Sequence, residues 1–495
     1  MQRGFDNDKY IQLQAERIRE RISQFGGKLY LEFGGKLFDD YHASRVLPGF
    51  EPDSKIRMLK SLIDDVEIVI AINANHIEKS KVRGDLGITY DEDVLRLMDI
   101  FRSMGFMVGS VVITHYASQP AADAFRARLT AMGITSYLHY PIAGYPYDID
   151  HIVSDEGYGK NDFVETSRPL VVVTAPGPGS GKMATCLSQL YHENKRGVTA
   201  GYAKYETFPI WNLPLKHPVN IAYEAATADL SDANIIDPFH LEAYGETTVN
   251  YNRDVEIFPV LKSMMERILG ESPYQSPTDM GVNMAGFAIV DDDAVRDAAN
   301  MEIVRRYFHA AVKAKRSGTP EAEEEVQKLE MIMNQAGVNA NLSPARSAAL
   351  LKEETTGGPA GAMVLPDGRV VTGKTGNLLG AASALLMNAL KGVSGVDDEL
   401  YVISDDVLEP ICHLKTEHLK SQNPRLHSDE TLLALSISSV TNPMAERLME
   451  NVDKLRGCDA YFSVIISSTD EKLYRTLGIN VCCEPKYEQH RYYHK

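Results

Sequence analysis

Cysteine, positive charge and long apolar runs are all scarce in this chain, and each shortage excludes a class of protein. There are 5 cysteines in 495 residues, an odd number without C-x-x-C spacing. This usage favours free thiols in a reducing cytoplasm over a disulfide framework. No run approaches the roughly 20 apolar residues of a membrane span, and the first ten residues lack a signal-peptide core, so no membrane partner is expected.

Basic residues are outnumbered by acidic ones, 51 to 68, which gives a formal net charge of −17. A protein that coats nucleic acid usually has a basic face, so no nucleic-acid partner is expected, and any phosphate ligand would need a local basic site. The hydrophobic content of 44% and charged content of 24% are typical of a soluble globular protein. The length predicts two or three domains.

Residues 168–194 predict a strand, a glycine-rich loop and a helix in succession. Leu170–Thr174 is a short β-branched run, as in a strand buried on both faces of a parallel sheet. The following PGPGSG, residues 176–181, can continue neither a strand nor a helix, because prolines lack donors and glycines favour unusual dihedrals. From Lys182 onward, apolar residues recur at helical spacing.

Such a loop directs backbone N–H groups and the positive end of a helix dipole at one place, and Lys182 adds a full charge. We therefore predict a phosphate or nucleotide site, with Mg²⁺ as a possible companion of the nucleotide. The match to G-x-x-x-x-G-K-[ST] is incomplete: Pro176 replaces the first glycine and Met183 replaces the hydroxyl that binds magnesium. The alternative is a tight connection whose glycines only permit close packing. The predicted phosphate-binding residues are Gly177, Gly179, Ser180, Gly181, Lys182 and Thr185.

Strand and helix signals alternate before this loop. Strands are expected at 66–72, 108–114 and 134–142, and helices at 54–63, 91–104 and 119–132. This is the rhythm of a doubly wound, mostly parallel α/β sheet, in which polar residues that follow the strands share one binding edge. The loop with Lys36, Asp39, Asp40 and His42 is equally consistent with such an edge or with a solvated surface.

Further strands are expected at 198–204 and 218–227, and acidic residues follow the second. Asp229 or Asp237 could organise magnesium, as a carboxylate does in P-loop enzymes. Asp237 and His240 are three apart and could act as a base with its orienting partner. The alternative for Asp237 is an ordinary helix cap before Pro238.

The chain after residue 255 predicts helices, followed by a second, smaller α/β region. We expect an N-terminal α/β domain at 1–255, a helical segment at 256–344 and a C-terminal α/β domain at 345–495. A hairpin should turn at 366–368, and strands are expected at 401–404, 432–437 and 461–466. Between hairpin and helix, TGKTG could form a second anion site or merely cap the helix start. Its candidate residues are Thr372, Gly373, Lys374 and Thr375.

One segment begins like a zinc-protease motif. His192-Glu193-Asn194-Lys195-Arg196 resembles H-E-x-x-H, but Arg196 stands where the second histidine ligand must be. A cation at that place disfavours zinc chemistry.

Four segments together resemble an uncharacterised bacterial family whose members have sometimes been labelled ATP-dependent zinc proteases. They are KLYLEFGGKLFDDYHASRVLPGF, TAPGPGSGKMATCLSQLYHE, SPTDMGVN and LPDGRVVTGKTGNLLGA. The resemblance covers nearly the whole chain and implies a cytoplasmic protein, α/β in both halves and a homo-oligomer. It supplies no activity and no catalytic residues.

Three functions are compatible with these patterns. The first is an enzyme that transfers phosphate or processes a phosphate ester, with a small phosphorylated ligand bound at residues 177–182. The second is a phosphate-binding or regulatory protein without turnover, which Met183 favours. The third is a structural homo-oligomer in which the glycines serve packing alone.

Overall fold

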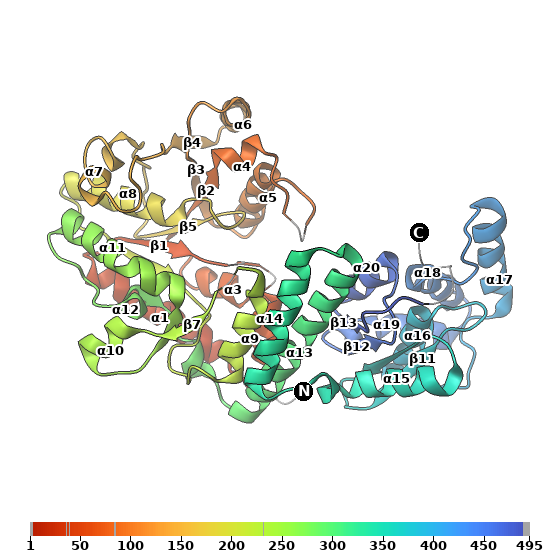
Figure 1. Cartoon of the computed structure of the whole chain (residues 1–495). Coiled ribbons are helices and arrows are strands. Elements are labelled where there is room, and N and C mark those ends of the chain that lie inside the picture. The colour runs from red at the N-terminus through yellow and green to blue at the C-terminus, as the bar shows by residue number, and fades with distance from the viewer. Residues whose placement is uncertain (1–2, 36, 39, 84–85, 231, 489–495) are drawn as a thin grey trace. The chain divides into compact units, whose positions relative to one another are not determined.

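The computed structural model describes residues 3–35, 37–38, 40–83, 86–230 and 232–488 (Figure 1). The chain forms two compact units, and neither is a single stretch of sequence. The N-terminal unit comprises residues 3–224 and 230–299. Among the described residues, the C-terminal unit comprises 225–229 and 300–488.

A seven-stranded sheet forms the centre of the N-terminal unit, and all its neighbouring strands are parallel. The α/β fold predicted from the sequence is therefore confirmed. In spatial order the strands are β4 (Thr135–Leu138), β3 (Met107–Thr114), β2 (Val66–Asn73), β5 (Leu170–Thr174), β1 (Leu29–Phe33), β6 (Gly201–Tyr205) and β9 (Gly281–Val282).

Helices flank this sheet and bury the central strands. All eight residues of β2 and all five of β5 are buried, as their β-branched composition predicts for parallel strands. The helices of this unit are α1 (Asn7–Gln24), α2 (Tyr41–Val46), α3 (Ser54–Lys60), α4 (Ala74–Glu78), α5 (Tyr90–Ser103), α6 (Pro120–Ala131), α7 (Ile149–Ile152), α8 (Lys182–Lys195), α10 (Pro238–Tyr244), α11 (Asn252–Leu269) and α12 (Pro277–Met280). A small antiparallel pair joins β7 (Asn234–Ile236) to β8 (Val249–Tyr251).

The strand order places the glycine-rich loop where ligands bind in open α/β sheets. From β1 the chain continues to β2, on one side, whereas from β5 it continues to β6, on the other side. Adjacent strands whose connections diverge in this way define a topological switch point, and a crevice forms beyond their carboxyl ends. Here the switch point lies between β1 and β5.

Three predicted strands are wrong. Residues 218–226 form helix α9 (Pro218–Ala226), because Pro218 suits a first helical turn and the buried Val219, Ala222 and Ala225 are three residues apart. Residues 432–437 belong to α18 (Ser428–Ser439), where burial also follows helical spacing. Residues 401–404 are irregular, and Tyr401 is exposed.

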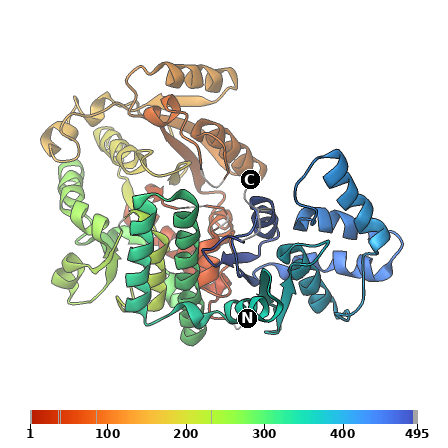
Figure 2. The same ribbon diagram turned by 45° about the vertical axis from the view of Figure 1, so that its right-hand side comes forward.

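The C-terminal unit contains a four-stranded sheet in the order β11 (Val370–Lys374), β10 (Ala360–Val364), β12 (Asp459–Phe462) and β13 (Asn480–Cys483). The predicted hairpin at 366–368 joins β10 to β11 and is confirmed. Helix α13 (Asp292–Ser317) leads into this unit and lies beside α14 (Pro320–Ala336), as Figure 2 shows. The other helices are α15 (Pro344–Thr356), α16 (Ala381–Ser394), α17 (Asp405–His413), α18, α19 (Pro443–Glu450) and α20 (Ser468–Thr476).

Within the described ranges, the model contains no helix that is long and apolar enough to cross a membrane.

Candidate functional site at the carboxyl edge of the seven-stranded sheet

The glycine-rich loop runs from the end of β5 to the start of α8, and neighbouring strands hold its backbone. Asn73 at the end of β2 donates from Nδ2 to the carbonyl of Gly179 at 3.0 Å. Thr114 at the end of β3 donates from Oγ1 to the carbonyl of Ser180 at 2.8 Å. Gly181 has a φ of +82° and directly precedes the helix, a conformation that favours glycine. The loop is thus fixed by side chains from two other strands.

Its backbone N–H groups form an unbonded cluster. From the loop through the first turn of α8, these N–H groups donate to no carbonyl and to no side-chain acceptor in the described part of the chain. Seven N–H groups share this property, those of Gly177, Gly179, Ser180, Gly181, Lys182, Met183 and Ala184. Free donors at a helix start attract anions, because the helix dipole adds to their partial charges.

The loop and the start of α8 contain one cationic side chain and two hydroxyls. Lys182 is half-buried and makes no ion pair or hydrogen bond with the residues that the structure describes. The buried Ser180 hydroxyl donates to the carbonyl of Gly177 at 2.8 Å, and that of Thr185 to the carbonyl of Gly181 at 2.9 Å. Both hydroxyl protons therefore stabilise the loop itself.

Basic side chains gather beside the loop although the protein is acidic overall. A Cβ atom on Gly179 would lie 3.4 Å from Cε1 of His76, which belongs to α4. Burial, then the charges of Lys81 and His115, lower the pKa of the His76 imidazole. The loop thus faces a neutral imidazole with lysine nearby, surroundings that suit an anionic ligand.

A row of buried and half-buried polar side chains extends across β1 and β6. Tyr202 donates from its hydroxyl to Oε2 of Glu32 at 2.7 Å. Two residues along β6, Lys204 is ion-paired with Asp254 of α11 and lies 3.1 Å from Oε1 of Glu206. Glu32 of β1 is level with Lys204 of β6 in the sheet. Charged residues inside a parallel sheet are unusual, and here most of them are half-buried and paired with one another.

Glu206 ends this row just beyond β6 and is only 6% exposed. Its Oε2 has no hydrogen-bond partner among the described residues, and neither has the indole nitrogen of Trp211. A Cβ atom on Gly281 would lie 3.1 Å from Glu206 Oε2 and 2.8 Å from Trp211 Cζ2, so both side chains border one place. Burial and the Asp254 charge raise the pKa of Glu206, which Lys204 only partly offsets.

Sequence reasoning missed this row, although β6 contains a signal for it. Lys204 and Glu206 occupy alternate positions in YAKYE, a pattern that places both charges on one face of a strand. Because helices pack against β6, that face is largely covered and not solvated.

The predicted dyad of Asp237 and His240 lies at the start of α10. The fully buried Asp237 carboxylate caps the helix by accepting from the backbone N–H groups of Phe239 and His240, and it also accepts from the hydroxyl of Thr278 at 2.6 Å. The His240 imidazole instead contacts Ser276 Oγ at 2.8 Å. The carboxylate therefore bonds the backbone of His240 and not its ring.

Asp229 is exposed in the short stretch 225–229, which belongs to the C-terminal unit. In the early loop, Lys36 and Asp39 lie outside the described residues. Asp40 pairs with Lys55 at 2.7 Å. Burial opposes ionisation there, but the lysine charge prevails and lowers the pKa of Asp40.

The second predicted anion site lies in a strand. Thr372, Gly373 and Lys374 belong to β11 and pair with β10, Thr375 follows them, and α16 begins only at Ala381. A Cβ atom on Gly373 would lie 2.2 Å from the backbone nitrogen of Leu385, so this glycine lets α16 pack against the strand.

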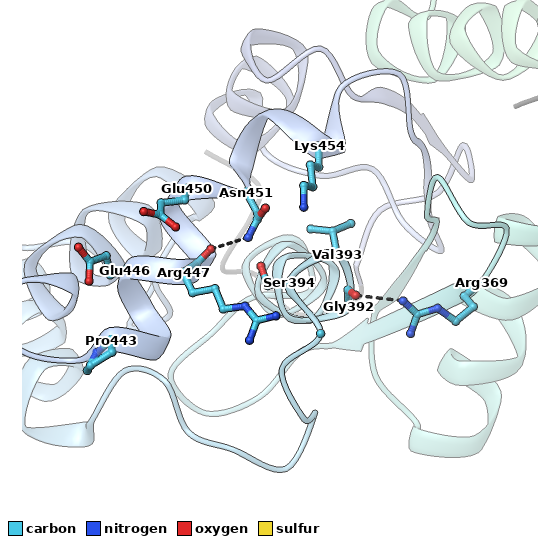
Figure 3. A pocket seen from close by; sticks show the side chains of 11 residues that line it. Arg369, Gly392, Val393, Ser394, Pro443, Glu446, Arg447, Glu450, Asn451 and Lys454 are labelled. Carbon is cyan, nitrogen blue, oxygen red and sulfur yellow. Dashed lines mark hydrogen bonds between the residues drawn. The ribbon is translucent and has the colours of Figure 1, made fainter.

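The C-terminal unit has a surface pocket of about 760 Å³ at the end of α16. In Figure 3 the side chains of Arg447 and Lys454 approach Ser394 from two sides, whereas Glu446 and Glu450 point away from it. None of the predicted site residues lines this pocket.

No cluster of three or more histidine, cysteine or acidic side chains suited to a metal occurs in the described ranges. The Arg196 guanidinium, at the position of the missing zinc ligand, stacks 3.6 Å from the ring centre of Phe163.

Two family models together match nearly the whole sequence. One, described as "Domain of unknown function DUF1846, N-terminal", matches residues 3–337, and its C-terminal counterpart matches 341–493. The chain is similar to a "UPF0371 protein" of Streptococcus thermophilus (strain ATCC BAA-491 / LMD-9), with 58% identity over 492 residues and 99% of each chain covered. A "UPF0371 protein" of Streptococcus pneumoniae (strain JJA) is also 58% identical over the same length, again with 99% of each chain covered.

Proposed function

Because the chain belongs to the DUF1846 family, whose domains are described as being of unknown function, we propose a function from the geometry: the N-terminal unit binds the phosphoryl group of a small phosphorylated ligand at residues 177–182. The ligand's phosphate accepts hydrogen bonds from the loop and from the first turn of α8, and Lys182 neutralises part of its charge.

The unbonded N–H cluster is the observation that supports this proposal most directly. Buried or half-buried donors are normally paired, so a run of donors without acceptors requires either water or a ligand. The cluster is located at the switch point of a parallel sheet, where such folds bind ligands. The charge of the neighbouring Lys81 favours an anion as that ligand.

The same observations bear on whether Mg²⁺ accompanies the ligand. Met183 replaces the usual hydroxyl, and the Ser180 and Thr185 hydroxyls donate within the loop. We therefore propose binding that does not depend on magnesium, with a nucleotide and its metal as the alternative. The five free cysteines support a cytoplasmic location, and a homo-oligomer remains part of the proposal.

The test combines thermal-shift and calorimetric measurements on the full chain with inorganic phosphate, pyrophosphate and nucleotides, each with and without Mg²⁺. Lys182→Ala should lower the affinity for pyrophosphate about ten- to hundred-fold, the range expected for a lost hydrogen bond to a charged group. The wild-type protein should gain about 2.7 kcal/mol of stability at 100 times the dissociation constant.

Lys374→Ala is the matched control, because Lys374 is an exposed lysine that also follows a glycine. It should leave the affinity unchanged. Equal affinities of wild type and Lys182→Ala would overturn the proposal. Tighter binding or turnover only with Mg²⁺ would instead favour the nucleotide enzyme.

A further inference from the structure

The surface pocket at the end of α16 is lined by basic side chains from three different segments. Arg369 lies in the hairpin between β10 and β11, Arg447 belongs to α19, and Lys454 belongs to the short helical turn Val452–Leu455. In Figure 3 these three side chains approach the end of α16 from three sides. Single exposed cations are ordinary on a protein surface, whereas like charges that converge on one cavity repel each other unless a counter-charge is present.

The protein itself supplies little of that counter-charge. The exposed side chains of Arg447 and Lys454 make no ion pair and no hydrogen bond with the residues that the structure describes. Glu446 and Glu450 also line the pocket, but in Figure 3 their carboxylates point away from the end of α16. The pocket therefore has spare positive charge in a protein whose formal net charge is −17.

The end of α16 does not need the two unpaired cations as caps. Cations often bond the last carbonyls of a helix, so capping is the alternative explanation for them. Gly395, with a φ of +64°, already closes this end by donating from its N–H to the carbonyls of Lys391 and Gly392. Arg369 donates from Nη2 to the same Gly392 carbonyl at 3.0 Å. These bonds cap the helix without the other two basic side chains.

The core of the C-terminal unit fixes the backbone from which both cations extend. Leu448 of α19 and Leu455 of the following turn are completely buried in the apolar core that they share with α16. Asn451 connects helix and turn by donating from Nδ2 to the carbonyl of Arg447 at 2.7 Å. A Cβ atom on Gly395 would lie 3.6 Å from Arg447 Nη2, so the guanidinium reaches the end of α16. A backbone held in this way lowers the cost of ordering the site when a ligand binds.

The lining favours a small, highly polar anion with more than one phosphate group. Guanidinium and ammonium groups bind phosphate oxygens through charge-assisted hydrogen bonds. The volume of about 760 Å³ is in the range of small-molecule sites. None of the described residues that line the pocket is aromatic, so no ring is available to stack on a nucleobase. Linked phosphates can contact cations on separate segments at the same time, which a single phosphate does less well.

We propose that this pocket is a second anion site, which binds the phosphate groups of a small di- or triphosphate ligand through Arg447 and Lys454. The site belongs to the C-terminal unit and does not depend on the proposed phosphate site at residues 177–182. Arg447 donates paired hydrogen bonds to phosphate oxygens, and Lys454 adds a second positive charge. Arg369 contributes less, because its Nε is already paired with Oδ2 of Asp367 at 2.7 Å.

The test is calorimetry on the full chain with tripolyphosphate, inorganic phosphate and citrate, each at low and at high ionic strength. Every variant is made both alone and together with Lys182→Ala, which weakens the first proposed site. Arg447→Gln and Lys454→Gln each remove one charge from the pocket, and both positions are exposed, so the fold should be retained. Lys472→Gln is the control, because Lys472 is an exposed lysine of the same unit that does not line the pocket.

The Lys182→Ala protein should still bind tripolyphosphate at one site, and more tightly than it binds inorganic phosphate. Arg447→Gln and Lys454→Gln should each lower this affinity about three- to tenfold, the range expected for contacts between charges that remain partly solvated. High ionic strength should weaken the binding as well, because salt screens such contacts. Lys472→Gln should leave the affinity unchanged, which separates the pocket from an effect of total charge.

The other outcomes overturn the proposal or part of it. Loss of all tripolyphosphate binding in Lys182→Ala would overturn the pocket and keep the site at residues 177–182. Equal effects of Arg447→Gln, Lys454→Gln and Lys472→Gln would reduce the binding to a general effect of charge and overturn the pocket too. Citrate that binds as tightly as tripolyphosphate would overturn the assignment to phosphate. No binding of any probe to wild type would overturn both sites.

Discussion

Two segments of this chain contain the same Gly-Lys pair after a strand-forming run, yet they have opposite structures. Gly181 and Lys182 begin a 14-residue helix, and the N–H groups around them are unbonded in the described chain. Gly373 and Lys374 lie within β11, where the backbone pairs with β10. A glycine-lysine pair can therefore serve as an anion site only where its backbone donors are left free.

The two segments also need their glycines for different properties. Gly181 is required for its backbone angle, with a φ of +82°. Gly373 is required for its lack of a side chain, because the backbone of Leu385 occupies the place of a Cβ. One is a conformational device at a potential ligand site, and the other is a packing device between a strand and a helix.

Among the substitutions that test this comparison, Gly373→Ala should have the largest effect on stability. The new Cβ would lie 2.2 Å from the Leu385 nitrogen, which α16 cannot move without disturbing its packing, so the unfolding free energy should fall by about 3 kcal/mol. Gly376→Ala is the control, since its Cβ would meet no atom closer than 3.9 Å. Chemical denaturation measures both, and equal stabilities would contradict the packing role.

A pH effect on stability is expected in the unit that contains β11. His427 Nδ1 lies 3.1 Å from Oδ2 of the buried Asp470, and this hydrogen bond raises the pKa of the imidazole. A histidine whose pKa is raised on folding stabilises the folded state. This stabilisation is complete below the unfolded pKa of about 6.5 and is lost as pH rises through the folded pKa.

Hydrogen exchange at pH 6 and pH 8.5 measures that loss. Protection of α18 and α20 should fall at the higher pH in wild type. His427→Gln should be less stable at pH 6 by about 1.5–3 kcal/mol, the range for hydrogen bonds to charged groups, and should lose its pH dependence in this window. The same pH response in His427→Gln would exclude the imidazole as its source.

A smaller effect, about 1 kcal/mol, is expected for Thr114→Val. The variant removes the hydrogen bond that holds the Ser180 carbonyl, and the loosened loop should also bind pyrophosphate less tightly. Thr372→Val is the counterpart in the other segment. Its change should stay within about 0.5 kcal/mol, because the backbone and not this hydroxyl holds β11 in place. Equal losses of stability in the two variants would show that the Thr114 hydrogen bond does not distinguish the loop from β11.

Local patterns in the sequence predicted the strand, loop and helix at residues 168–194, because each depends on neighbouring residues. The phosphate site at residues 177–182 stays a prediction, which the binding experiments with Lys182→Ala test. The strand order was beyond sequence reasoning, because β5 pairs with β1 and β2 from more than 90 residues away.

Sequence reasoning missed the charged row of β1 and β6 for a related reason. Lys204 and Glu206 look like a solvated strand face until Asp254, 50 positions along the chain, is brought against them. The wrong strands at 218–227 and 432–437 were short apolar runs, which fit a buried helix as well as a strand.

Helix α13 has a consequence for the order of events during synthesis. Its Phe308 packs against Tyr461 of β12, with ring centres 5.1 Å apart, and its Arg305 pairs with Asp459. At a translation rate of 5–20 residues per second, the 142 residues from the end of α13 to the start of β12 take roughly 7–28 seconds to synthesise. The seven-stranded sheet is therefore synthesised well before β12. During this interval the side of α13 that packs against β12 has no partner strand, and a chaperone could cover it.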